Sequence, residues 1–498
     1  MPTFTITSIR NATSSIDRPT RNAARPHGSS GRALPPCRSD PNLTRWLGAM
    51  CVPSNAREEK LMPGLHNRLT FVIGSMVLFA NGASAQTMQP MEHGGAAKVS
   101  QPATVIESPT KTALPIAVPL PVCPAGQPFD PSMNMCMADN TKAMSALTFS
   151  LNQFAVYSTT SGPRGRSRVT GPGLGMLMYN QALSPRNTLR VNIMGTAEQL
   201  TVGDKGTPQL FQTENIDNMH PHDYLMALEF RDVMKLGAGD DQELTFLFAP
   251  RGAAATGPVP FMHRASAEGN PDAPLGHNLQ DGLHDVSTVL GVAYRNSGTT
   301  VEATGFSGHA TSWPFPLHKV DSYSVRLTQK INDHVLLGAS YADVLSPDEA
   351  EGAEHEKFIT GWLATTQKLN GATLNSSLIW GQVRAGRNPA LNSFLAEAVS
   401  QSGMNKLYGR GEFLQITPGQ LDLVPTGGST DAKWVAALTL GYERTLVQKG
   451  PFSIFLGGSF TRDFAPVDFR PDYGSAPRGA KLYFRIKIDT SSIMLDGM

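Results

Sequence analysis

Short segments with a two-residue hydrophobic period fill the chain after about residue 145. In KLYFRIKI (481–488) every second residue is Leu, Phe or Ile, and the residues between them are Lys, Tyr or Arg. In HDYLMALEFR (222–231) the same period predicts an apolar face made of Tyr224, Met226, Leu228 and Phe230. Because successive side chains of a strand point to opposite faces, each segment predicts a β-strand with one apolar and one polar side.

The connections between these segments alternate between two lengths. Every second connection is a short turn, such as SPRN, NSG, LNG or VQKGP, and the longest of the others runs from Pro250 to His284. A soluble β-sandwich also alternates in hydrophobicity, but short turns alternating with long loops are typical of a single-chain outer-membrane barrel. We therefore predict an all-β fold over residues 141–490, an antiparallel transmembrane up-and-down β-barrel of about 16 strands (14–18), followed by a C-terminal tail at 491–498.

The composition agrees with a barrel. Apolar residues make up 40% of the chain and charged residues 17%, which is polar for a membrane protein and poor in charge for a soluble enzyme. The net charge of +1 gives no sign of a nucleic-acid partner. No apolar run reaches the ~18 residues that a transmembrane helix needs, so strands are the expected way across a membrane.

A targeting segment begins at Met62 rather than at the first residue. A short n-region is followed by LTFVIGSMVLFA and then by ASA (83–85), the small-x-small pattern that signal peptidase reads. We predict a signal peptide at 62–85 with cleavage before Gln86, and hence export to the outer membrane. Residues 1–61 carry no apolar periodicity, so either translation starts at Met62 or the n-region is unusually long.

The segment 86–140 is rich in Pro, Ala, Thr and Ser and is expected to be a disordered, flexible periplasmic tether. Cys123 and Cys136, the two cysteines that remain after cleavage, predict a disulfide in the oxidising periplasm. A soft-metal thiolate site is the alternative, because three methionines lie beside them. A second candidate copper site in the leader comprises Met88, Met91 and His93, whose thioether and imidazole groups suit Cu(I); plain low complexity is the other interpretation.

The polar faces of the strands predict a charged interior. The expected lumen-lining residues are Glu229, Arg231, Arg326, Arg410, Glu412, Glu443, Lys481, Arg485 and Lys487. Such charges are costly against lipid but are hydrated in a wide lumen. Because a barrel of about 16 strands leaves an aqueous channel unless loops fold into it, we predict a porin-like channel for small polar solutes or ions.

Two long loops carry histidines and aspartates and leave the barrel at the same rim. The candidate metal ligands are His220, His222, Asp223, His263, His277, Asp281 and His284. Imidazoles and carboxylates that converge from two loops suit a divalent transition metal or copper. They suit equally a hydrogen-bonded brace that holds an infolded loop at the pore mouth, with Arg264 paired to a carboxylate.

Several motifs resemble those of a known family. HPHD, FMHR, NPDAPLGH and VDSYSVRL, preceded by CPAGQ, resemble a family of largely uncharacterised bacterial outer-membrane, porin-like β-barrels, and the resemblance covers roughly residues 120–488. Some relatives carry Met- and His-rich leaders and are associated with heavy-metal or copper resistance. The resemblance therefore implies copper handling as an alternative function, and it implies no catalytic residues.

An enzyme is a further alternative. Ser266 lies near His263 and Asp281 in the sequence, but none of the GxSxG, HExxH, Walker or dinucleotide motifs occurs in the context that it requires. We expect no enzyme activity, with a barrel-embedded hydrolase as the alternative. The expected partners are outer-membrane lipid, small solutes or ions and the barrel-assembly machinery, although DTSSIMLDGM replaces the terminal aromatic residue that this machinery commonly reads.

Overall fold

The structure is a computed structural model that describes residues 145–237, 241–308, 317–345, 355–424 and 428–490, together with three two-residue strands. Two of these strands, β1 (Phe129–Asp130) and β2 (Met135–Cys136), pair with each other in antiparallel fashion. Several predictions lie outside the described residues. They are the assignment of residues 1–61, the signal peptide at 62–85, the flexible tether at 86–140 apart from β1 and β2, the leader site of Met88, Met91 and His93, and the side chains of Cys123 and Cys136. They stay predictions.

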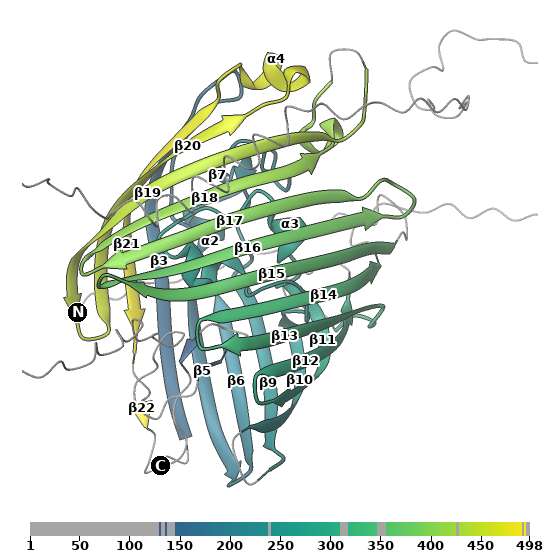
Figure 1. Ribbon diagram of the computed structural model, residues 1–498, viewed down its shortest axis with the longest axis vertical. Helices are drawn as coiled ribbons and strands as arrows, with labels where there is room; N and C mark the ends of the chain where they lie inside the picture. The colour runs from purple at the N-terminus through teal and green to yellow at the C-terminus, as the bar shows by residue number, and fades with distance from the viewer. Residues whose placement is uncertain are drawn as a thin grey trace, which may run out of the picture. The chain divides into compact units, whose positions relative to one another are not determined.

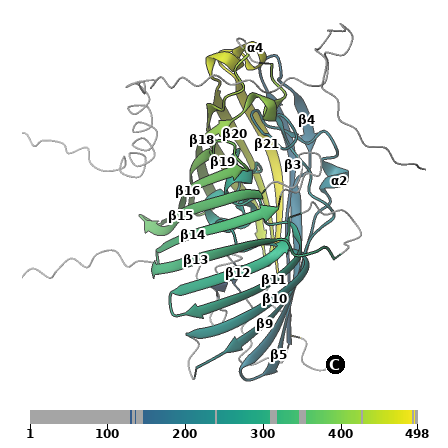
Figure 2. The ribbon, with the colours of Figure 1, turned by 90° about the vertical axis from the view of Figure 1, so that its right-hand side faces the viewer.

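Sixteen antiparallel strands close into a barrel (Figure 1). They are β3 (Ser145–Thr160), β5 (Gly173–Ser184), β6 (Asn187–Gly195), β9 (Leu225–Lys235), β10 (Gln242–Gly252), β11 (Val286–Asn296), β12 (Thr299–Ser307), β13 (Ser322–Asn332), β14 (Val335–Leu345), β15 (His355–Leu369), β16 (Ala372–Ala385), β17 (Leu391–Ser402), β18 (Asn405–Ile416), β19 (Lys433–Lys449), β20 (Phe452–Phe464) and β21 (Arg478–Asp489). Each strand pairs with the next along the chain, and β21 pairs with β3 to close the ring (Figure 2). The predicted fold class and strand number are confirmed.

Two short strands extend the closing seam. β4 (Ser167–Thr170) pairs with β3, and β22 (Ile493–Met494) pairs with Leu147 and Ala146 of β3. The second pairing attaches part of the predicted C-terminal tail, residues 491–498, to the barrel. The physical reason is that β3 is longer than β21, so its first residues leave backbone hydrogen-bonding groups that the end of the chain can meet.

The outward faces of the strands are apolar and exposed. In β21, Leu482 and Phe484 are 58% and 53% exposed, whereas Arg485 between Phe484 and Ile486 is fully buried. Each of the sixteen barrel strands carries at least one large apolar side chain that is exposed in this way. Exposed apolar surface of this extent is rare on soluble monomers and is the arrangement of a barrel whose outer face meets lipid.

β9 departs from the predicted alternation at Met226. The pairing between β6 and β9 shifts by one residue between Met194 and Gly195, which leaves Met226 as the extra residue of a β-bulge. The bulge turns this side chain into the barrel, where it is 1% exposed. The prediction that Met226 shares the outer face of Leu228 and Phe230 is therefore wrong.

Short turns join the strands at one end of the barrel and longer loops join them at the other. In the turn between β15 and β16, Asn370 and Gly371 have φ angles of 50° and 82°, which a tight hairpin requires. The loops at the other end contain α2 (Glu198–Thr201), β7 (Thr207–Pro208), β8 (Asn218–Met219), η1 (Phe261–His263), η2 (Ala265–Ala267), α3 (His277–Gln280), η3 (Pro418–Leu421), η4 (Val467–Phe469) and α4 (Arg470–Tyr473). None of the helices in the described ranges is both long and apolar enough to span a membrane.

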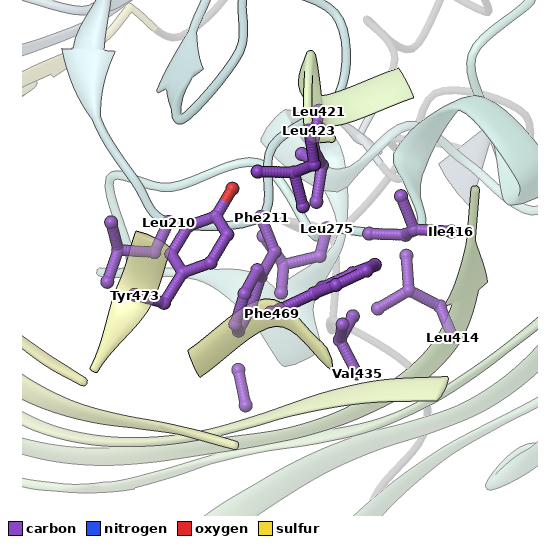
Figure 3. Packing of buried hydrophobic residues seen from close by; sticks show 11 residues of the cluster. Leu210, Phe211, Leu275, Leu414, Ile416, Leu421, Leu423, Val435, Phe469 and Tyr473 are labelled. Carbon is purple, nitrogen blue, oxygen red and sulfur yellow. The ribbon is translucent and has the colours of Figure 1, made fainter. Parts of the chain in front are cut away.

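Apolar side chains tie the loops together at this end, as Figure 3 shows. The cluster comprises Leu210, Phe211, Leu275, Leu414, Ile416, Leu421, Leu423, Val435, Ala437, Phe469 and Tyr473. Arg164 braces it, because its guanidinium pairs with Asp217 at 3.0 Å and donates to the carbonyl of Leu421 at 2.7 Å. Residues from four loops thus form one packed unit around the mouth of the barrel.

Candidate functional site

Residues 253–285, the connection between β10 and β11, fold into the barrel and are named here the lumen loop. Its helices η2 and α3 contact β16 and β17, which lie five to seven strands away from β10 and β11 around the ring. Figure 1 shows α3 behind β16, inside the ring of strands. The contact is close because Gly381 of β16 has no side chain: a Cβ atom there would lie 2.0 Å from the carbonyl oxygen of Leu279.

Arg264 is the central anchor of the lumen loop. It pairs with Asp281 of the same loop and, from Nε to Oε1 at 2.7 Å, with Glu397 on β17. Arg410 of β18 pairs with the other carboxylate oxygen of Glu397 at 3.1 Å, and all four side chains are buried. Burial alone would raise the pKa of Asp281, but Arg264 and His277 hold this pKa below its ordinary value. This is the arrangement of the predicted brace.

A second set of anchors joins the loop to β18 and β21. Glu268 pairs with Lys406 of β18 at 2.8 Å and with Arg485 of β21 at 3.4 Å. Against the effect of burial, Lys487 and Lys406 hold the pKa of Glu268 well below its ordinary value. The hydroxyl of Tyr483 donates to the carbonyl of Gly269 at 2.6 Å.

Further along the loop, Asp272 pairs with Lys481 of β21, and its carbonyl accepts from Arg410 at 2.7 Å. The backbone N–H of Leu275 donates to Glu412 at 2.5 Å. The loop therefore supplies carboxylates and carbonyls to a wall that is rich in cations.

The predicted lumen-lining residues all belong to barrel strands, and their side chains lie on the inner side. Five of them are buried: Glu229, Arg410, Glu412, Glu443 and Arg485. For these five residues, the expectation that the charges meet open water is wrong. The physical reason is that the lumen loop covers them and pairs with several, which replaces hydration with ion pairs and hydrogen bonds.

The predicted metal ligands are brought together only in part. Asp223 pairs with Arg251 at 2.9 Å, and Asp281 pairs with Arg264 and with His277. Within the described ranges, no group of three or more His, Cys, Asp or Glu side chains is placed to hold a metal ion. The predicted imidazole–carboxylate set is therefore not a site as proposed, because arginines occupy its carboxylates.

Four of the predicted histidines form a row of neighbouring rings. The ring centroids of His220 and His222 lie 5.2 Å apart, those of His222 and His284 5.6 Å, and those of His284 and His277 4.9 Å. Burial lowers the pKa of His284 well below its ordinary value. His222 is equally buried, but its contact with Glu198 raises its pKa.

His263, the remaining predicted histidine ligand, lines one cavity together with His222 and another together with His284. Burial lowers its pKa to about 4, so the imidazole is neutral at physiological pH. Methionines line the same cavity walls, Met176 and Met194 in one cavity and Met226 and Met262 in the other, and Met178 packs in the same cluster. The sequence did not predict this group. Part of the methionine cluster is visible in the sequence, because the period of two in LGMLM (174–178) places Leu174, Met176 and Met178 on one face of a strand.

A cavity of about 20 Å³ lies beside Asp272 and Leu275 of the lumen loop, and two larger ones flank the loop elsewhere. The larger has a volume of about 500 Å³, and its wall includes Lys368, Lys487 and Asp489 near the turn end of the barrel. The smaller, of about 70 Å³, lies between the loop and the strands from β5 to β13, beside Glu302 and Arg326. The larger cavity ends against the loop residues 261–271. The fold and the site together define a barrel of sixteen strands whose lumen holds one of its own loops.

No protein-family model and no curated protein matches the chain. Among solved structures, it is similar to an anion-selective porin from Comamonas acidovorans, with 10% sequence identity, 69% of this chain and 100% of that chain covered, and a TM-score of 0.44. It is also similar to a loop L8 deletion mutant of OmpT, an outer membrane protein of Vibrio cholerae (8% identity, 69% and 99% covered, TM-score 0.43), and to Salmonella typhi OmpF in a complex with daunomycin (8%, 68% and 97%, 0.44). Sequence identities and TM-scores this low describe a general likeness between β-barrels, and they carry no information about solute or activity.

Proposed function

We propose that the chain is an outer-membrane channel for small polar solutes or ions, narrowed by its lumen loop. The observation that carries this proposal is the contrast between the two faces of the same strands. The outer face exposes large apolar side chains on all sixteen barrel strands, whereas the inner face carries charges such as Arg326 and Lys487. Charged inner walls are found in barrels that enclose water.

The lumen loop sets the size of the passage. A barrel of sixteen strands leaves an aqueous channel when it is not plugged. Here the loop reaches across to β16, β17, β18 and β21, and the larger cavity ends against it. We therefore expect a low conductance while the loop is docked, and a high one when it leaves the wall.

Conductance in planar bilayers tests the proposal. The wild-type chain should give small, infrequent current steps, and a variant whose residues 258–280 are replaced by a short Gly-Ser linker should give large, long-lived ones. A variant shortened in the connection between β16 and β17 serves as the control, because residues 386–389 of this connection are exposed. If the linker variant assembles into membranes and passes no current, the barrel is not a channel.

We propose transport rather than catalysis. Ser266, the nucleophile that the sequence offered, has its hydroxyl 2.7 Å from that of Ser377 and 3.0 Å from the carboxylate of Glu397. These contacts support a role in anchoring the loop. Metal handling stays the second candidate function, and the thioether and imidazole groups beneath the loop favour it.

A further inference from the structure

Five methionines gather on one side of the lumen. Met176 and Met178 belong to β5, Met194 to β6, Met226 to the bulge of β9 and Met262 to the lumen loop. The first four are at most 7% exposed, and Met262 packs against them. Met176 and Met194 are direct partners in the β5–β6 pairing, which places their Cβ atoms about 4.5–5.5 Å apart. The thioethers therefore converge beneath the loop.

Two buried imidazoles beside this group have an unused nitrogen. His222 and His284 are 7% and 5% exposed, and the Nε2 atom of each has no hydrogen-bond partner among the described residues. The Nδ1 atom of His284 lies 2.9 Å from the carbonyl oxygen of Asp281. A carbonyl only accepts hydrogen bonds, so Nδ1 carries the hydrogen, and Nε2 of the neutral ring presents a lone pair.

His222 is held in a similar way by a carboxylate. Its Nδ1 atom lies 2.8 Å from Oε2 of Glu198, which also accepts from the backbone N–H of His222 at 2.9 Å. A ring whose Nδ1 is fixed by a carboxylate or a carbonyl, with Nε2 left as an electron-pair donor, is the usual second-shell arrangement of a metal-binding histidine. Leaving a buried acceptor unpaired costs about 1–3 kcal/mol, which a ligand at Nε2 would remove.

The methionines and the histidines border the same spaces. His222 lines the larger cavity together with Met226 and Met262. His284 lines the smaller cavity together with Met176 and Met194. An ion in this region would therefore meet sulfur from the strands and nitrogen from the loops.

We propose that this cluster of thioethers and imidazoles is a binding site for Cu(I), with methionine sulfurs and Nε2 of His222 or His284 as ligands. Thioether and imidazole donors favour the soft monovalent ion over hard cations, which prefer carboxylates. Binding is ligand exchange: Cu(I) gives up solvent, and neither the metal nor the protein changes oxidation state. The inference goes beyond the channel function and does not depend on it.

Packing is the competing explanation, since methionine also fills irregular gaps in apolar cores. Leucine separates the two ideas, because it is similar in volume and apolar but has no sulfur. The strand pair Met176 and Met194 can be replaced by leucine with little loss of packing. Met404, which is exposed in the turn between β17 and β18, gives the matched control.

The test uses the full chain in detergent, titrated with Cu(I) against a chromophoric Cu(I) chelator. The leader and cysteine candidates are first removed by M88L, M91L, H93Q, C123S and C136S. This background should hold about one Cu(I) per chain with sulfur and nitrogen neighbours in X-ray absorption spectra. Adding M176L and M194L should abolish the tight site, and adding M404L should leave it unchanged.

Replacement of Glu198 by glutamine tests whether the carboxylate that holds Nδ1 of His222 supports metal binding. We expect this change to lower the affinity for Cu(I) by 10–100-fold. Should the leucine variant fail to assemble, H284Q provides the same test with the methionine packing intact. A background chain that binds no Cu(I), or a leucine variant that binds it as tightly and with the same number of sulfur neighbours, would overturn the inference. Binding is measured without current, so failure here leaves the conductance test untouched.

Discussion

Replacement of Arg264 by methionine should release the lumen loop from the wall of the barrel. Methionine keeps much of the volume of the side chain but removes its pairs with Asp281 and Glu397. Breaking a buried ion pair by removing one partner typically costs about 3–5 kcal/mol. The lower end applies here, because Asp281 keeps His277 and Glu397 keeps Arg410. A loss of ~3 kcal/mol changes the ratio of docked to released loop by roughly 100-fold.

Single-channel recording measures this ratio directly. R264M should raise the fraction of time in the high-conductance state by roughly 100-fold, up to saturation, with the size of the open step unchanged. Arg478 is the matched control, because it is an exposed arginine at the start of β21, so R478M should behave like the wild type. If R264M forms a heat-resistant barrel with wild-type open times, the loop is not held in place by Arg264, and the reasoning fails.

Three further changes test separate parts of the structure. G381A should increase open times without altering any charge, because the added Cβ would lie 2.0 Å from the carbonyl of Leu279; unchanged recordings would show that the loop docks elsewhere. L327R should destabilise the barrel by about 2–4 kcal/mol if this 48% exposed side chain lies near the bilayer midplane, with L327F as the control and urea unfolding in lipid vesicles as the measurement. Acid should open the channel: the pKa of His263 is about 4 with the loop docked and near 6.5 when exposed, so its contribution to docking is complete above pH 6.5 and falls toward pH 4. The loss is about 2 kcal/mol at pH 5, and His284 acts in the same direction; open times that are independent of pH over this interval would contradict the assignment.

The barrel could be predicted because its two solvents impose a simple rule on the sequence. In KLYFRIKI (481–488), lipid selects one set of alternate residues and the interior selects the other, so the period of two is visible without knowledge of any partner strand. The ends of strands are predicted less closely: the segment 222–231 predicts a strand, and the observed strand runs from Leu225 to Lys235. The bulge at Met226 depends on the pairing with β6, which no local pattern of β9 contains.

The site could be predicted only where its contacts are local. The sequence predicted that Arg264 pairs with a carboxylate, and Asp281 in the same loop is one of its partners. Its other partner, Glu397, is 133 positions further along the chain and was not identified. The methionine cluster needs three strands and a loop to come together, so hydrophobic period alone could not distinguish it from ordinary packing.

The contacts that close the lumen also determine its charge when the loop leaves. Among the described residues of β17 to β21 that pair with the loop or with each other beneath it, five are cations, namely Lys406, Arg410, Lys481, Arg485 and Lys487, and four are the carboxylates Glu397, Glu412, Glu443 and Asp489. The loop offsets this surplus through Glu268, Asp272 and Asp281, of which only Asp281 has a cation, Arg264, in the same loop. Release therefore exposes a wall with excess positive charge in a narrow, low-dielectric passage, which concentrates anions. Reversal potentials of R264M in a salt gradient should show anion preference in the open state, and a cation preference would mean that the wall is not the surface that permeating ions meet.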